Sequence, residues 1–398
     1  MRIITNQAGL EALCAELQTN SFLCVDTEFL RDTTYWPRLC LVQVAGAGVE
    51  AIIDPLAQDF GGPEDHPRTL APLVALLSDE GVLKVFHAAR QDMELFVHRL
   101  GVLPKPIFDS QIAAMVCGFG ESVGYETLVK SMLSRDLDKS SRFTDWSRRP
   151  LTEKQLAYAM GDVTHLRDLY PILAESLARE GRAAWVAEEV AALENPSLYT
   201  LEPEDAWRRL KTRNTSRKFM GVLKALAAWR ECEAQGRDVP RARIVKDDAL
   251  LELAGAAPQS KEDMERLRGV PKGFANSAQG RAALEAVAQG LAMPREEIPV
   301  VTKSAPTPAG LGPLIDLLRV LLKTVCEDHG VAGKLIATSA DLERIAAEDA
   351  PDVPALSGWR REIFGDAALR LKDGRLALGA RGRTVALIEV DGGRTAEG

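Results

Sequence analysis

The chain has 398 residues, of which 46% are hydrophobic and 27% charged, and its formal net charge is −8. This length predicts two or three domains, the composition is ordinary for a globular protein, and no apolar run is long enough to span a bilayer. The acidic balance argues against a protein that coats nucleic acid nonspecifically. It is compatible with a nucleic-acid enzyme, because bound metal ions offset an acidic site locally.

The first residues and the cysteines predict a cytoplasmic protein. Met1–Gln7 lack the continuous apolar core of a secretory signal. The cysteines are widely spaced and form no C-x-x-C pair. This pattern indicates small buried hydrophobic residues and not a disulfide framework or a zinc site. The six are Cys14, Cys24, Cys40, Cys117, Cys232 and Cys326.

Residues 1–195 predict an α/β domain with a mixed sheet and helices on its faces. Runs rich in Val, Ile, Leu and Phe, bounded by turn residues, predict strands at Phe22–Phe29, Arg38–Ala45, Val49–Asp54, Leu83–His87 and Ile107–Phe108. The first three follow one another so closely that we expect antiparallel strands linked by hairpins. Helical spacing or end signals predict helices at Leu70–Asp79, at Arg90–Leu100 before Gly101, from Ser110, and from Thr152, which forms a capping box with Gln155.

The second half predicts two smaller units. A break falls at Asn195–Ser197, after which strand signals fade. Residues 204–292 predict a small all-α domain, residues 293–311 a linker rich in Pro, Thr, Ala and Gly, and residues 312–392 a third, mainly helical domain. Leu371–Val390 has strand-like alternation, so the helical prediction is weakest there.

Asp26 and Glu28 are the first candidate site residues. On a strand they point to the same face. Between Val25 and Phe29, two neighbouring like charges are costly to bury unless a cation pairs with them. The alternative is a strand end at which both side chains reach solvent.

Asp92 and the pair Tyr158 and Asp162 complete the candidate set. Asp92 follows a buried strand, where α/β folds place their sites, although an acid in the first turn of a helix is also favoured by the helix dipole. Tyr158 and Asp162 are four residues apart and share one helix face. Gly161, costly inside a helix, suggests close approach of another backbone or of substrate. Carboxylates from three segments suit divalent metal ions and phosphodiester cleavage.

Four further residues are weaker candidates. His87 could contact a phosphate or the terminal ribose, or be a satisfied structural histidine. Gln43 and Gln111 could support metal ligands or make structural hydrogen bonds. Asp109 could support a ligand or cap the helix from Ser110.

The longest acid-free basic run begins at Trp207. Its cations could bind phosphates while Trp207 and Phe219 stack on bases. The alternative is a solvated helix face with both aromatic side chains in the core, and we favour the core for the aromatics. The candidate RNA-binding residues are Arg208, Arg209, Lys211, Arg213, Arg217 and Lys218.

The three acidic segments resemble the motifs of the DEDD superfamily of 3′→5′ exonucleases, in its tyrosine-bearing branch. Asp26 and Glu28 match the first motif, Asp92 matches the second, and Tyr158 and Asp162 match the third. The surrounding residues resemble the ribonuclease D family at Val25–Phe29, Phe108–Gln111, Asp145–Leu151 and Gln155–Val163. The resemblance covers roughly residues 1 to 190 and implies a ribonuclease H-like exonuclease domain.

The resemblance implies two divalent ions, Mg²⁺ or Mn²⁺, bound by the four acids. Asp26 would bridge both ions, Glu28 and Asp162 would hold the ion that carries the nucleophilic water, and Asp92 would hold the second. Tyr158 would orient the water. The product would be a nucleoside 5′-monophosphate.

The second half also resembles this family. Residues 204–292 resemble an HRDC domain, best over Arg237–Leu250, and the third unit resembles a divergent HRDC-like domain, mainly over Leu356–Arg360. The family implies RNA with a free 3′ end, such as a tRNA precursor, as partner, held by the helical domains, and we expect a monomer. The alternatives are a DNA-directed exonuclease of the same superfamily and an inactive RNA-binding module, which the complete acidic set opposes.

Overall fold

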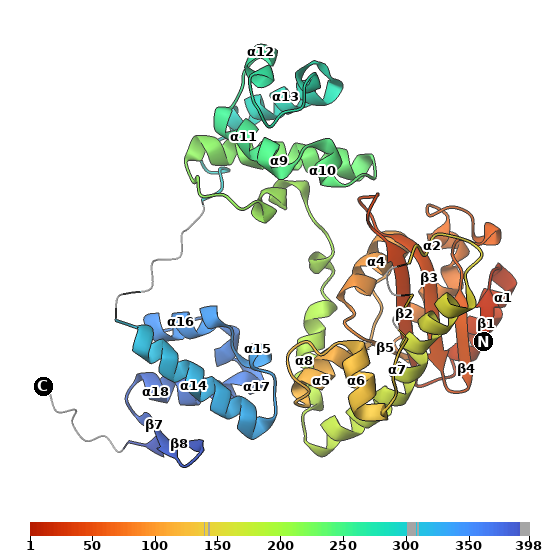
Figure 1. Cartoon of the computed structure of the whole chain (residues 1–398), viewed down its shortest axis with the longest axis vertical. Coiled ribbons are helices and arrows are strands. Elements are labelled where there is room, and N and C mark those ends of the chain that lie inside the picture. Colours follow the sequence, from red (N-terminus) through yellow and green to blue (C-terminus); the bar gives the residue numbers. More distant parts are fainter. Residues whose placement is uncertain (139, 142–143, 301–307, 309, 391–398) are drawn as a thin grey trace, which may run out of the picture.

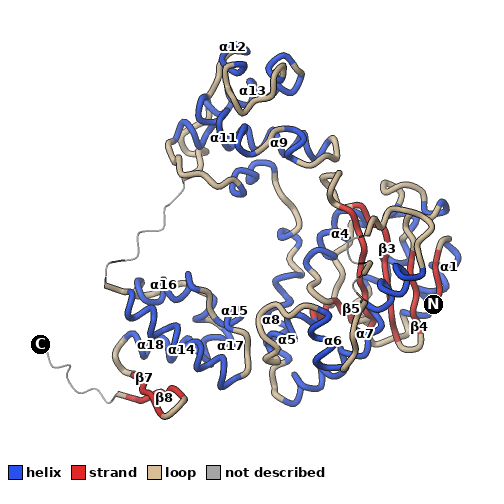
Figure 2. The backbone as a smooth tube through the Cα atoms, viewed as in Figure 1, coloured by secondary structure: helices blue, strands red, loops and turns tan. Residues whose placement is uncertain are grey.

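The computed structural model describes residues 1–138, 140–141, 144–300, 308 and 310–390. The first unit, residues 1–194, is built on a six-stranded mixed sheet (Figures 1 and 2). Strands β2, β3 and β4 are antiparallel neighbours, as predicted. The other pairings are parallel: β1 with β4, β5 with β2, and β6 with β5. In sheet order the strands are β1 (Arg2–Ile4), β4 (Val49–Ile53), β3 (Arg38–Gly46), β2 (Phe22–Leu30), β5 (Leu83–Phe86) and β6 (Ile107–Asp109).

Helices cover both faces of this sheet, which confirms the predicted α/β arrangement. On one face the main core packs Leu23 and Val25 of β2 against α1 (Gln7–Leu17), α3 (Ala71–Ser78) and α4 (Arg90–Leu100). On the other face, Cys24 of β2 packs against α7 (Glu153–Arg179). The remaining helices of the unit are α2 (His66–Thr69), α5 (Ser110–Val116), α6 (Tyr125–Leu133), α8 (Ala183–Leu193) and the short η1 (Gln58–Phe60).

The start of α7 is fixed by its own sequence, as predicted. The Thr152 hydroxyl accepts from the Gln155 amide at 3.2 Å, and the Gln155 side chain accepts from the Thr152 amide at 3.0 Å. Just before this capping box, Arg149 donates to both carboxylate oxygens of Asp54, at 2.8 and 2.7 Å. The first turn of α7 is therefore anchored to the end of β4, and the helix lies across β2 and β3.

The middle unit, residues 204–292, is helical throughout, as predicted. Its two longest helices cross closely, because a Cβ added at Gly290 would lie 2.5 Å from the Cα of Val222. Leu223, Leu226 and Leu250 are fully buried in its core. Its elements are η3 (Pro203–Arg209), α9 (Arg217–Gly236), α10 (Arg241–Ile244), α11 (Asp247–Ala256), α12 (Lys261–Glu265), η4 (Phe274–Asn276) and α13 (Ala278–Ala292).

The third unit, residues 312–390, is helical and ends in a β-hairpin, which explains the strand-like alternation near its end. The hairpin consists of β7 (Leu376–Arg381) and β8 (Thr384–Glu389). Its helices are α14 (Gly312–His329), α15 (Gly333–Ile336), α16 (Ser339–Ala347), η5 (Pro354–Leu356), α17 (Gly358–Arg360), a π-helical turn (Arg361–Gly365) and α18 (Asp366–Lys372). Residues 301–307 and 309 of the predicted linker, and 391–392 of the predicted third domain, lie outside the described residues.

Both helical units contact the first unit, one at each end (Figure 1). The β2–β3 loop reaches the middle unit, where the Trp36 amide donates to Asp238 at 2.9 Å. The third unit packs on α8 through Trp359, whose ring stacks on Trp185 with centroids 4.5 Å apart. A short turn, η2 (Pro196–Leu198), begins the connection from α8 to the middle unit.

The structure also tests the predictions about the cysteines and about membrane-spanning segments. All six cysteines are free; Cys14, Cys24 and Cys40 are buried, whereas Cys232 is exposed, which departs from the expected burial. Within the described ranges, no helix is both long enough and apolar enough to cross a membrane.

Candidate active site

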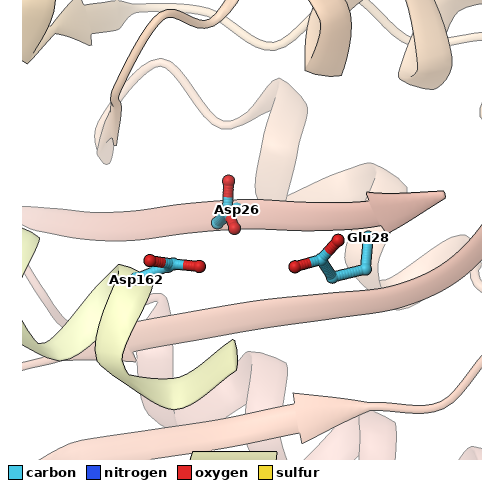
Figure 3. Close-up of side chains that lie close together, drawn as sticks. All are labelled: Asp26, Glu28 and Asp162. Carbon is cyan, nitrogen blue, oxygen red and sulfur yellow. The ribbon is translucent and has the colours of Figure 1, made fainter. Parts of the chain in front are cut away.

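Three of the predicted acids converge between β2 and α7. Carboxylate oxygens of Asp26, Glu28 and Asp162 all lie within 4.8 Å of one another. Asp26 and Glu28 come from alternate positions of β2, on the side that α7 covers, and Asp162 comes from α7 itself. Figure 3 shows the carboxylates of Glu28 and Asp162 directed toward each other beside Asp26. The three side chains are half-buried, so the alternative of solvent-exposed strand-end positions is wrong.

Burial and mutual repulsion disfavour the charged forms of these acids. Burial raises the pKa of Asp26 from its ordinary 3.8 to about 7. Burial, and then the charges of Asp26, Asp162 and Asp92, raise the pKa of Glu28 to about 10. These directions follow from gathering like charges away from water. A divalent ion would reverse them, because hard cations prefer carboxylate oxygens.

Asp92 approaches from α4 and lies outside the three-residue cluster. It is 7% exposed in the first turn of the helix, as predicted. Thr27, between the two acids of β2, donates its hydroxyl to Asp92 at 2.5 Å. Burial, and next the charge of Asp26, raise the pKa of Asp92 well above its usual range. The charges of Asp92 and Asp26 therefore influence each other.

Tyr158 lies one turn before Asp162 on the same helix, as its spacing predicted. Its ring centroid lies 6.1 Å from that of the buried Trp146, and its side chain lines the same cavity as Asp162. Of the two explanations for Gly161, close approach of another backbone is wrong, because a Cβ there would meet only the ring of His165, at 3.8 Å. Close approach of substrate stays a prediction. The space beside Gly161 is open to a side chain, so the residue is not required by crowding.

The carboxylates line a cavity of about 590 Å³. This volume is typical of small-molecule sites and can receive the end of a nucleic-acid strand. Besides the three acids and Tyr158, its wall includes Phe29, His87, Gln91, Gln111 and Tyr125.

His87 faces this cavity with one ring nitrogen in use. Its Nδ1 lies 2.9 Å from the Ser110 hydroxyl, whereas its buried Nε2 has no hydrogen-bond partner among the described residues. Burial lowers the pKa of His87, so the ring is neutral near pH 7. The structural role thus accounts for Nδ1, and contact of Nε2 with substrate stays a prediction.

Asp109 organises the turn from β5 into α4. Its carboxylate accepts from the amides of Ala88 at 3.0 Å and Ala89 at 2.9 Å. It also accepts from the first amides of α5, which confirms the capping alternative. Ala88 has a φ of 59°, a left-handed conformation that is uncommon outside glycine. One buried acid therefore fixes the turn that presents Asp92.

The two glutamines differ in their surroundings. The Gln111 side chain donates to the Val123 carbonyl at 3.0 Å and lines the cavity. Gln43 is fully buried on β3, opposite Asp26 in the strand register. Neither polar atom of its side chain has a hydrogen-bond partner among the described residues.

The basic run of the middle unit is on the surface, with its aromatic residues inside. Phe219 is 6% exposed in the core and Trp207 packs against that core, so the aromatic prediction is confirmed. Arg208 forms an ion pair with Asp205 at 2.7 Å. All six candidate RNA-binding residues are exposed: Arg208, Arg209, Lys211, Arg213, Arg217 and Lys218.

Thr27 and Tyr125 are site residues that sequence reasoning missed. Strand alternation places Thr27 opposite Asp26 and Glu28, toward α4, and this was a usable signal. The Tyr125 hydroxyl donates to the carbonyls of Gly161 at 3.1 Å and Asp162 at 2.7 Å. That contact links α6 to α7, and the residues around Tyr125 carry no pattern that predicts it.

Comparisons with known proteins agree with this site. A family model described as 3′-5′ exonuclease matches residues 1–178, and one described as HRDC domain matches residues 219–287. Ribonuclease D of Granulibacter bethesdensis is 47% identical over 387 residues, which cover 97% of this chain and 96% of that protein. Ribonuclease D of Acidiphilium cryptum is 49% identical over 391 residues, which cover 98% and 97%.

A solved structure extends the likeness to the three-dimensional fold. The crystal structure of Escherichia coli RNase D, described as an exoribonuclease involved in structured RNA processing, matches with a TM-score of 0.78 at 28% identity. The match covers 94% of this chain and 98% of that one. With similarity of this degree along nearly its whole length, the chain belongs to the ribonuclease D family and is a 3′→5′ exoribonuclease.

Proposed function

We propose that this exoribonuclease works with two divalent metal ions, Mg²⁺ or Mn²⁺, held by Asp26, Glu28, Asp92 and Asp162. The observation that carries the proposal is the convergence of the Asp26, Glu28 and Asp162 carboxylates within 4.8 Å. Asp92 is hydrogen-bonded to Thr27, the residue between Asp26 and Glu28 on β2. All four donors are oxygen atoms, which hard divalent cations prefer. When bound, such ions supply Lewis-acid stabilisation of the attacking and leaving oxygens of a phosphodiester.

The protein's own groups position the reactants. Tyr158, on the cavity wall one turn from Asp162, orients the attacking water through its hydroxyl. Thr27, on the face of β2 opposite to Asp26 and Glu28, holds Asp92 in place through its hydroxyl. His87 lines the part of the cavity that would receive the terminal nucleotide. Water attacks the last phosphodiester, the 3′ oxygen of the preceding nucleotide leaves, and a nucleoside 5′-monophosphate is released.

The substrate that we propose is the 3′ end of a structured RNA, such as a tRNA precursor. The combination of an exonuclease unit with exposed cations on a helical HRDC unit supports it. Tyr158 supports assignment to the tyrosine-bearing branch. We further propose that the protein is a cytoplasmic monomer.

The domain organisation is part of the same proposal. It comprises the exonuclease domain at 1–195, a first HRDC domain at 204–292, a linker at 293–311 and a divergent HRDC-like domain at 312–392. The helical core around Leu318, Ile345 and Phe364 supports a separate third domain, and its terminal β-hairpin is the departure from an all-helical module.

Digestion of a 3′-extended tRNA tests this function. We expect shortening from the 3′ end with Mg²⁺ or Mn²⁺ and none with EDTA. Asp162→Asn should keep the fold and lose activity by more than the roughly 100-fold that removal of an outer-sphere partner of a metal costs. Activity that survives Asp162→Asn would contradict the metal assignment, and equal hydrolysis of matched deoxyribo-oligonucleotides would contradict the preference for RNA.

A further inference from the structure

A second cavity, of about 270 Å³, lies where the first and middle units meet. Its walls come from the β2–β3 loop, the start of α4, the connection at residues 198–201 and two segments of the middle unit. Four arginines line it, Arg31 and Arg90 from the first unit and Arg209 and Arg241 from the middle unit, together with a single carboxylate, Glu94. A local excess of positive charge in a chain of net charge −8 suits an anionic ligand.

Two of these arginines form ion pairs with carboxylates. Arg31 pairs with Glu94 at 2.5 Å, and Arg241 pairs with Glu231 at the same distance. No ion pair of Arg90 or Arg209 occurs within the described part of the chain. Both side chains are exposed and both line the cavity. Guanidinium groups of this kind match phosphate oxygens in charge and geometry.

The second cavity adjoins the active-site cavity along two chain segments. Phe29 and Gln91 line the active-site cavity. Arg31, two residues after Phe29, and Arg90, one residue before Gln91, line the second cavity, which we call the arginine cavity. A strand whose 3′ end lies among the carboxylates would therefore continue past the end of β2 and the start of α4. Its next phosphates would meet the arginines.

The junction around the cavity is built from contacts between the two units. The Tyr35 hydroxyl accepts from Arg241 at 2.9 Å, and the Arg241 guanidinium lies 4.7 Å from the Tyr35 ring centroid. Arg99 donates to the carbonyls of Trp36 and Pro37, at 3.0 and 2.6 Å, at the base of the same loop. The loop that carries one wall of the cavity is thus held against the middle unit, and Arg90 and Arg209 are not needed for that attachment.

We propose that the arginine cavity binds backbone phosphates of the RNA upstream of its 3′ end, through Arg90 and Arg209. The inference rests on the proposed entry of the 3′ end at the carboxylates. It gives Arg209 a different role from Arg208, its neighbour in the basic run, which pairs with Asp205. Because the site draws on both units, only RNA long enough to span them benefits from it.

Substrate length and a charge-matched control test the proposal. We would compare Arg209→Glu with Arg266→Glu, which makes the same charge change at an exposed side chain outside the cavity, in the same unit. Hydrolysis would be measured on a dinucleotide and on an oligoribonucleotide of about 20 nucleotides, longer than typical single-strand site sizes. Arg209→Glu should raise KM for the long substrate at least about tenfold more than for the dinucleotide, and the slope of log KM against log salt should flatten by about 0.7 for each phosphate that the protein no longer neutralises.

Binding separates this proposal from the catalytic one. Fluorescence anisotropy of the long RNA in EDTA reads the cavity without hydrolysis, and Arg90→Gln provides a second variant from the other wall. Weaker binding by both variants, with Arg266→Glu unchanged, supports the site. Equal effects of Arg209→Glu and Arg266→Glu, or equal effects on both substrate lengths, would overturn it even if wild-type hydrolysis is normal. An inactive wild type would instead count against the proposed function.

A free mononucleotide is another source of the same phosphate chemistry. Thermal stabilisation by adenosine monophosphate should be the same in wild type and Arg209→Glu, whereas stabilisation by the long RNA should be smaller in the variant. Stabilisation by the mononucleotide that depends on Arg209 would make the cavity a mononucleotide site and would exclude the RNA path.

Discussion

At the scale of single residues, the acidic cluster makes the metal-free protein sensitive to pH. The pKa of Asp26 is raised by burial to about 7 from an ordinary 3.8. Between these values the folded chain binds more protons than the unfolded chain, so its free energy of unfolding falls as pH rises. The stabilisation is complete below pH 4 and is lost as pH rises through 7.

We therefore expect the melting temperature in EDTA to fall between pH 5 and pH 8. Asp26→Asn should make this dependence less steep, by on the order of a few kcal/mol across the range, and leave the part that comes from Glu28 and Asp92. Added Mg²⁺ should restore the wild type at pH 8, because it binds only the folded site. Calorimetry in EDTA and in Mg²⁺ measures both effects. A wild-type melting temperature that rises with pH more steeply than that of Asp26→Asn would refute the expectation.

The buried side chain of Gln43 lies beside the acidic cluster, and its role can be tested by substitution. An unpaired buried polar group costs about 1–3 kcal/mol, and Gln43 is fully buried opposite Asp26 with both polar atoms unpartnered among the described residues. We expect its amide to donate to Asp26 once that carboxylate is ionised. Gln43→Leu should then leave stability equal or higher while kcat falls by roughly 10-fold and KM stays constant. Loss of stability with unchanged kcat would assign Gln43 a packing role only.

Residue-level prediction from sequence worked where the signal was local. Alternation along β2 placed Asp26 and Glu28 together, and helical spacing placed Tyr158 beside Asp162. The hydrogen bonds of Asp109 to the turn before α4, and of Thr27 to Asp92, join segments that only the tertiary fold brings together. No pattern within either segment specifies its partner.

At the scale of elements, α7 carries two of the proposed site residues, and its start is set by a capping box. Thr152→Ala removes a side-chain acceptor for a backbone amide and should cost about 1 kcal/mol. We expect a fall of roughly 2–4 °C in melting temperature for a unit of this size, and a lower kcat because Tyr158 lies less than two turns away.

A threonine on the same helix supplies the control for Thr152→Ala. The Thr164 hydroxyl donates to the Met160 carbonyl at 2.9 Å inside α7, a bond that adds little to helix stability. Thr164→Ala should therefore be close to neutral in thermal melts. Equal destabilisation by both substitutions would mean that the cap does not set the helix start.

Helix boundaries were predicted correctly where the sequence carries a strong capping residue. Gly101 ends α4 in a left-handed conformation and Thr152 caps α7, so both boundaries were predicted. The strand β1, with three residues, is too short to show a periodicity, and it was missed together with α1. The β7–β8 hairpin was visible as alternation, but its isolation from the main sheet is a tertiary property.

At the scale of the whole molecule, the arrangement of the three units depends on contacts between residues far apart in sequence. Arg360 donates to the Leu335 carbonyl at 2.5 Å and forms ion pairs with Glu188 and Glu189 of α8. Its side chain and that of Glu189 are each 13% exposed. Neither these ion pairs nor the stacking of Trp185 on Trp359 can be predicted from the sequence. Each partner alone resembles an ordinary surface or core residue.

Arg360→Glu should release the third unit from the first. The substitution places a third carboxylate beside those of Glu188 and Glu189 and removes the buried Arg360–Glu189 pair. Breaking a buried pair costs about 3–5 kcal/mol. We expect the radius of gyration from small-angle X-ray scattering to increase by a few ångströms, on the order of what separation of a domain of this size produces. The neighbouring Arg361→Glu is the matched control, because Arg361 is 57% exposed and pairs with Asp366 within its own unit. If Arg360→Glu scatters like the wild type, the stacked tryptophans hold the interface by themselves; if Arg361→Glu also expands the molecule, the effect is one of general charge and not of this contact.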